Sequence, residues 1–201
     1  MTVRLPVTAD DLERAVDLVV AALRHAEDLD WSVPAGSLEW DCRRTADHLG
    51  RCLIAYASQL AVQPADRYVL FTASAEDSAR PAEMLEFVQA GGRLLATMVR
   101  TSPPATRAYH PSGTSDPEGF AGMGCVETLI HGHDIATGLG LALEPARDMC
   151  ARVLARMFPD LAAGEPEADP WQALRYATGR VALPDSPQLS SWRWRGAPLD
   201  G

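Results

Sequence analysis

Residues 116–140 read DPEGFAGMGCVETLIHGHDIATGLG, and this stretch decides the fold. It opens on aspartate and proline, the usual order for an N-cap and the first residue of a helix. It closes on Gly-Leu-Gly, a typical helix termination. The stretch therefore predicts a helix from 117 to about 137. Within it Glu127, His131 and Asp134 recur at spacings of four and three, which places them on one face.

Three further helices are expected upstream of this stretch. The first follows Thr8, a good N-cap, because apolar residues after it recur with helical spacing. The second runs from about 41 to 60, and the third runs from 81 to 98. Between them, residues 67–72 are β-prone and are expected to form one short strand. The proline-rich segment 101–117 is expected to be a loop that covers a pocket.

The C-terminal part of the chain differs in character. Two shorter helices are expected after residue 145. Beyond them, apolar runs at 181–183 and 189–194 flank a proline-containing turn, which is the pattern of a small β-hairpin. We therefore predict a mainly α fold in two parts. A four-helix bundle occupies residues 1–143, and an appendage of short helices and a hairpin occupies residues 144–201.

Composition narrows the class of protein. The 201 residues are 47% hydrophobic and 22% charged, close to the globular average, and the formal net charge is -9. Phosphate backbones and anionic lipid repel such an acidic chain, and its longest apolar run is too short to span a bilayer. We therefore expect neither a nucleic-acid nor a membrane partner. The absence of lysine excludes Schiff-base chemistry, lysine-dependent pyridoxal phosphate sites and a P-loop.

Other absences bear on location and origin. The first eleven residues lack the basic segment and apolar run of a signal peptide, and the four cysteines show no C-x-x-C spacing, so we expect a cytoplasmic protein with reduced thiols. Asparagine is missing as well as lysine, and both use codons beginning AA, which indicates a GC-rich genome. The chain has neither the G-x-S-x-G motif of a nucleophile elbow nor the G-x-G-x-x-G motif of a dinucleotide site.

The polar stripe on the 117–137 helix is unusual for a helix interior. Two carboxylates and an imidazole share one face of a central helix when they are solvated, hydrogen-bonded or joined by a cation. A metal needs a third ligand from a facing helix, and His48 in the 41–60 helix is the candidate. Cys52 follows one turn later and is close enough to approach the same metal. His133 points to nearly the opposite side of its helix.

Two histidines and one carboxylate leave coordination positions open for water or substrate, as in catalytic zinc and non-haem iron sites. The ligand set alone does not choose the metal. A glutamate and a histidine at this spacing more often form a solvated or hydrogen-bonded pair without a metal. Spacing alone therefore leaves both interpretations open.

Three segments together resemble a known family. They are WDCRRTADHL at 40–49, ETLIHGHDI at 127–135 and the tail between Trp171 and Trp194. They are similar to the N-terminal domain of mycothiol-dependent maleylpyruvate isomerases, which belongs to the DinB/YfiT-like metalloenzymes. The resemblance implies an up-and-down four-helix bundle. It also implies that a divalent metal, usually zinc, is bound by His48, Glu127 and His131.

The resemblance further implies that mycothiol, a low-molecular-weight thiol, is the co-substrate. A thiolate activated by the metal would attack a small-molecule electrophile, giving either an S-conjugate or an isomerised product. GC-rich actinobacteria make mycothiol, which agrees with the base composition. We expect Asp134 to orient His131 or a bound water. Asp134 and Arg180 are our catalytic candidates, with Arg180 and Arg193 expected to bind an anion.

Two other functions stay open from the sequence. One is a metal-dependent hydrolase, in which the open position holds a water whose pKa the metal lowers. The other is a non-catalytic bundle that binds a small molecule. Bundles of this type often dimerise through helix faces, so a homodimer is expected, although the sequence indicates no particular face.

Overall fold

The computed structural model describes residues 4–164 and 169–199, and these are mainly helical. The four long helices are α1 (Ala9–Arg24), α2 (Cys42–Val62), α3 (Pro81–Thr101) and α4 (Pro117–Gly138). Three short helices follow, α5 (Arg147–Met157), α6 (Pro159–Gly164) and α7 (Pro170–Ala177), where the sequence predicts two. None of the described helices is both long enough and apolar enough to cross a membrane.

Short polar side chains begin three of the long helices, as their sequence positions predict. Thr8 accepts a hydrogen bond from the backbone N–H of the third residue of α1, in a capping box. Asp41 and Asp116 accept the corresponding bonds at α2 and α4. Proline occupies the first position of α3 and α4, where its missing N–H leaves no hydrogen bond unmade. Local sequence therefore sets where these helices start.

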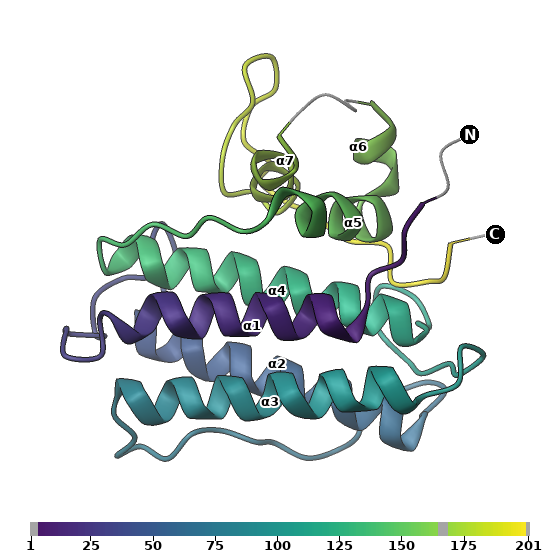
Figure 1. Cartoon of the computed structure of the whole chain (residues 1–201), viewed down its shortest axis with the longest axis horizontal. Coiled ribbons are helices and arrows are strands. Elements are labelled where there is room, and N and C mark those ends of the chain that lie inside the picture. Colours follow the sequence, from purple (N-terminus) through teal and green to yellow (C-terminus); the bar gives the residue numbers. More distant parts are fainter. Residues whose placement is uncertain (1–3, 165–168, 200–201) are drawn as a thin grey trace.

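The four long helices form a bundle (Figure 1). Around the bundle, the order of neighbours is α1, α3, α2 and α4, and α4 packs again on α1. Helices α1 and α3 run antiparallel. Two ion pairs show this direction: Asp17 with Arg93 and Asp10 with Arg100, each at 2.7 Å. Helices α1 and α4 run parallel, with the contact pairs Leu12–Gly124 and Val19–Gly132.

The helix directions differ from the up-and-down order that we predicted. Helix α2 begins beside the end of α4, where Cys42 Sγ lies 3.8 Å from the carbonyl oxygen of Ile135, so these two helices are antiparallel. Helices α2 and α3 are consequently parallel. The connection at residues 63–80 returns along the outside of the bundle before α3 begins (Figure 1). The chain therefore runs up, down, down and up.

Helix α4 is the central element, with contacts to α1, α2, α3 and α5. It is buried around most of its circumference, and its glycines let the neighbouring helices approach closely. A Cβ on Gly132, for example, would lie 2.5 Å from a Val19 methyl carbon. Polar side chains on such a helix need partners from other helices, because water reaches few of them.

The predicted C-terminal β-hairpin is wrong. Helix α5 packs on α4 and carries α6 and α7, but the described residues beyond α7 contain only an isolated bridge between Leu183 and Ser186. The last segment crosses the end of the bundle instead: Arg195 N–H donates to the carbonyl of Met157, and Gly196 N–H donates to that of Ser112. These two bonds lie just after the second predicted strand, and they hold the end of the described chain against α5 and the loop before α4.

The strand predicted at residues 67–72 is also absent. The Gln59 side chain satisfies this backbone instead, accepting a hydrogen bond from Val69 N–H (2.9 Å) and donating one to the carbonyl of Arg67 (3.2 Å). The segment runs beside α2 and lines the largest of the cavities described below. Residues 101–117, which we predicted to cover a pocket, do not line that cavity.

Candidate metal centre

Helix α4 presents three polar side chains along one face, at the predicted positions. Glu127 Oε2 lies 3.2 Å from His131 Nε2, and His131 Nδ1 lies 3.2 Å from Asp134 Oδ2. Glu127 and Asp134 are buried, and the His131 side chain is 14% exposed. The stripe is therefore not a solvated surface, and its charges depend on partners within the protein.

Helix α2 brings a second histidine to this stripe. His48 stands six residues after Cys42, which contacts Ile135, so in an antiparallel pair it comes level with the Glu127–His131 turn of α4. His48 Nε2 lies 3.8 Å from Glu127 Oε2, and the rings of His48 and His131 meet edge to face with centroids 5.0 Å apart. One ligand atom from each of His48, Glu127 and His131 lies within 4.8 Å of the other two.

The groups around these three side chains hold them in a geometry that fits a divalent metal. The Tyr56 hydroxyl donates to Glu127 Oε1 (3.0 Å), which leaves Oε2 directed at the two histidines. Asp134 holds His131 through Nδ1, so Nε2 is the nitrogen that faces Glu127. Carboxylate–histidine pairs of this kind orient metal-binding imidazoles. Two imidazole nitrogens and one carboxylate oxygen are also a ligand set of catalytic zinc sites.

Arg180 holds the outer end of this chain of contacts. Its Nη2 lies 2.7 Å from Asp134 Oδ2 and its Nε donates to Oδ1 at 3.2 Å, while Nη1 donates to the carbonyl of Thr178. We predicted Arg180 to bind an anion, but the structure commits its guanidinium to Asp134. Arg180 and Asp134 are thus positioned to orient His131. Arg193, the other predicted anion-binding residue, donates to the carbonyl of Pro111 in an exposed part of the tail.

The cluster favours a positive charge beside its carboxylates. Burial raises the pKa of Glu127, but hydrogen bonds and charge interactions with His131 and His48 outweigh burial and hold it well below its usual range. Burial lowers the pKa of His131, yet hydrogen bonds with Asp134 and Glu127 raise it to about 9. In the metal-free protein, the extra proton on His131 therefore provides the positive charge that a bound cation would supply.

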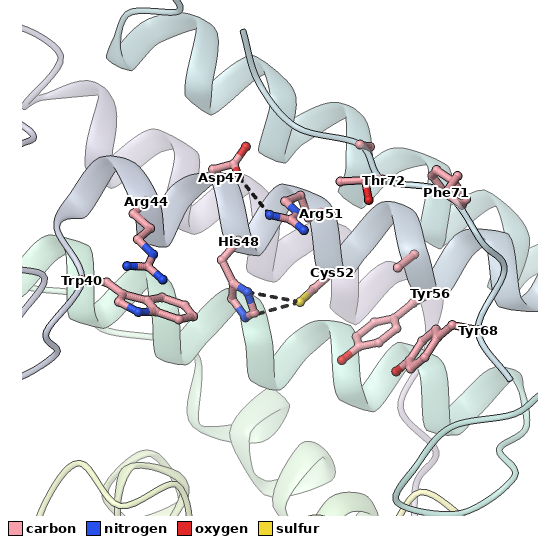
Figure 2. Close-up of a pocket in the computed structure, with 12 residues that line it drawn as sticks. Trp40, Arg44, Asp47, His48, Arg51, Cys52, Tyr56, Tyr68, Phe71 and Thr72 are labelled. Atoms are coloured by element: carbon pink, nitrogen blue, oxygen red, sulfur yellow. Dashed lines mark hydrogen bonds and ion pairs between the residues drawn. The ribbon is translucent and has the colours of Figure 1, made fainter. Parts of the chain in front are cut away.

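A cavity of about 480 Å³ opens beside His48 (Figure 2). Helix α2 forms one wall, and residues 68–73 form the other. Tyr56 and Tyr68 reach into it from these two walls, and Arg44 lies at its rim with its guanidinium 4.6 Å from the centre of the Trp40 ring. A cavity of this size accommodates a small molecule next to His48.

Cys52 lies in the same cavity, one turn beyond His48 as predicted. Its Sγ is 3.4 Å from His48 Nε2 (Figure 2). Burial, with the Glu127 charge as a smaller cause, raises the pKa of the Cys52 thiol well above its ordinary value, so the group stays protonated. Its sulfur is outside the set of ligand atoms that lie within 4.8 Å of one another. We therefore place Cys52 next to the cluster and not in it.

Other polar residues of α4 and α2 have separate roles. His133 points away from the cluster, as predicted, and its ring packs edge to face on Trp171 with centroids 5.5 Å apart. Our sequence reasoning missed the contributions of Tyr56 and Tyr68. Tyr56 carried a signal, because it follows His48 by two helical turns on the same face of α2. Tyr68 carried none, since its position depends on a loop held by a distant side chain.

The chain matches the model of a known protein family. Residues 9–136 match the family model described as the mycothiol maleylpyruvate isomerase N-terminal domain, which covers α1 to α4 and all three ligand residues. Searches of curated proteins and of solved structures each found no match.

Proposed function

Because the chain belongs to the mycothiol maleylpyruvate isomerase N-terminal domain family, we propose that it is a metalloenzyme that uses mycothiol as its co-substrate. We propose zinc as the metal and His48, Glu127 and His131 as its ligands. One observation carries this proposal: three ligand atoms lie within 4.8 Å of one another, and one of the three residues, His48, lines a 480 Å³ cavity. Three protein ligands leave a coordination position for a ligand from the cavity.

A divalent cation in this place supplies a Lewis acid that lowers the pKa of a thiol entering the cavity. The protein's own residues do the rest of the positioning. Tyr56 and Asp134 fix Glu127 and His131 through the hydrogen bonds described above. Arg44 and Tyr68 offer hydrogen-bond donors to the polar part of a ligand in the cavity.

The proposed reaction is attack of the thiol sulfur on a carbon electrophile. If the electrophile carries a leaving group, that group departs with its electron pair and the product is an S-conjugate. If the sulfur adds reversibly to an activated double bond, rotation about the resulting single bond and expulsion of the thiol give an isomer. The family match covers residues 9–136 and does not distinguish transfer from isomerisation. The turnover assay below distinguishes these two reactions.

The test uses zinc-loaded, untagged protein. We expect calorimetry to detect mycothiol binding, and chromatography to detect mycothiol-dependent turnover of maleylpyruvate or S-conjugation of 1-chloro-2,4-dinitrobenzene. Both signals should disappear in Glu127→Gln and persist in Glu86→Gln, which removes an exposed carboxylate on α3. A zinc-loaded protein that does not bind mycothiol contradicts the proposal. Hydrolysis of p-nitrophenyl acetate that needs zinc and no thiol would favour a hydrolase.

A further inference from the structure

The candidate metal centre borders a second cavity, smaller than the first. Its volume is about 300 Å³, and its lining consists of Leu38, Glu39, Trp40, His48 and His131. Two residues, Trp40 and His48, line both cavities. Their rings meet edge to face with centroids 5.1 Å apart, so they form a partition that the two cavities share. His48 therefore faces both cavities, and His131 faces the smaller one.

The two cavities differ in the chemistry of their walls. The larger one presents hydrogen-bonding groups, namely the hydroxyls of Tyr68 and Thr72 and the guanidinium of Arg44. Among the described residues, no carboxylate lies within ion-pair distance of Arg44, so its donors are available to a ligand. In the smaller cavity, Leu38 and the Trp40 indole form an apolar wall beside His131, and Glu39 is exposed. The larger cavity suits a hydroxyl-rich molecule, and the smaller one suits a compact molecule with a planar or apolar part.

We propose that the two cavities bind the two reactants at the same time, the sugar-bearing thiol in the larger cavity and the carbon electrophile in the smaller one. This inference rests on the proposed function and adds a site for the second substrate. Mycothiol joins a cysteine thiol to two hydroxyl-rich rings, which matches the donors of the larger cavity. A reaction between two molecules gains rate when both are held in contact in a fixed orientation. His48 lines both cavities, so the two reactants meet beside its ring.

The chemical step balances without an oxidant or a reductant. A lone pair of the thiol sulfur forms the new bond to the electrophilic carbon, and the thiol proton passes to solvent. In a substitution, the bond from carbon to the leaving group breaks and the leaving group takes the electron pair. In an isomerisation, sulfur adds to the activated double bond and the π electron pair moves onto the activating group. After rotation that pair re-forms the double bond, the carbon–sulfur bond breaks, and the departing sulfur regains a proton from solvent.

Matched tryptophan variants test this assignment. Ala55→Trp fills the larger cavity, Leu38→Trp fills the smaller one, and Leu94→Trp adds the same side chain to the exposed face of α3. The probe is S-methyl mycothiol, which cannot react, and its affinity is measured by calorimetry on zinc-loaded protein. We expect Ala55→Trp to weaken binding about tenfold or more, and the other two variants to change it by less than about twofold. Zinc content is measured in every variant, so an intact cluster is verified independently of activity.

Each alternative outcome has a distinct meaning. Weaker binding in Leu38→Trp alone would place the thiol in the smaller cavity and overturn the assignment. Equal weakening in both cavity variants would indicate one ligand that spans the two cavities, which also overturns it. If the wild-type protein fails to bind the probe at millimolar concentration, the proposed function fails instead. Where a variant loses zinc, a crystal structure of the wild type with the probe decides, since sugar density beside Leu38 overturns the inference and density between α2 and residues 68–73 supports it.

Discussion

Two buried polar clusters lie along α4, one at its beginning and one at its middle. The first surrounds Arg156 of α5, whose side chain is fully buried. Its guanidinium donates to Asp116 at the start of α4 (2.9 Å) and to the carbonyls of Arg195 (3.1 Å) and Gly196 (3.3 Å). We call this the closed cluster, because its cation and its anion both come from the protein.

The second group, His48, Glu127, His131 and Asp134, is the open cluster. Its two carboxylates lie close to two imidazoles that carry a positive charge only when protonated, and it borders two cavities. A buried charge needs a partner in either case. The closed cluster has its cation within the chain, and it ties α4 to α5 and to the C-terminal segment. The open cluster has room for a cation from outside. Burial alone therefore does not separate a structural cluster from a candidate site, whereas the origin of the positive charge does.

Removing a ligand from the open cluster should have the largest effect. We expect His131→Ala to lower zinc affinity by about a thousandfold, because it removes one of three protein ligands and leaves Asp134 without its imidazole partner. Competition with a chromophoric chelator measures this change. Retention of wild-type affinity would show that the open cluster does not hold the metal.

Removing the cation of the closed cluster should act on stability alone. We expect Arg156→Met to lower the free energy of unfolding by about 3 kcal/mol, because a partly buried Asp116 loses its charged partner. Urea denaturation measures the change, with Arg100→Met as an exposed control that should change the stability much less. Zinc content should stay at the wild-type level. Loss of zinc from a folded Arg156→Met protein would show that the closed cluster also supports metal binding, which contradicts the distinction between the two clusters.

A smaller change in the open cluster should leave the ligands in place. We expect Asp134→Asn to lower zinc affinity about 10- to 100-fold, because the amide holds the His131 ring less firmly and leaves the Arg180 charge without its counter-ion. The same titration of zinc against a chelator measures the effect. Asp28→Asn, an exposed change in the loop after α1, serves as the matched control and should have no effect.

The smallest expected effect concerns the hydroxyl that steadies Glu127. Tyr56→Phe removes one hydrogen bond to Oε1 and keeps the ring, so we expect about a fivefold loss of zinc affinity, or ~1 kcal/mol. Tyr176→Phe on α7 is the control with the same chemical change. An unchanged affinity in both variants would mean that Tyr56 packs beside the cluster without positioning it.

The helices and the ligand stripe were predictable because they depend on local sequence. Caps at Thr8 and Asp116 and the spacing of apolar residues define the helix starts, and the spacing of four fixes Glu127 and His131 on one face. His48 was chosen from helical position and from a family resemblance, and the structure places it within reach of the other two. The division at residues 143 and 144, the cytoplasmic location and the homodimer stay predictions.

The errors concern contacts between distant parts of the chain. The direction of α3 depends on the path of residues 63–80, which no helical periodicity encodes. The apolar runs at 181–183 and 189–194 do not pair as a hairpin, and the residues just after them bond to α5 and to the loop before α4. The sequence also did not reveal that Arg180 pairs with Asp134, and its expected anion binding stays a prediction. In each case the pattern identified the residue type correctly and could not identify its partner.

One measurement tests the distinction between the two clusters most directly: metal content by plasma mass spectrometry on untagged protein. The samples are the wild type, Glu127→Gln from the open cluster and Asp116→Asn from the closed one. We predict about one divalent ion per chain in the wild type and in Asp116→Asn, and none in Glu127→Gln. An ion-free wild type after reconstitution with zinc, or equal metal content in the two variants, would contradict the account.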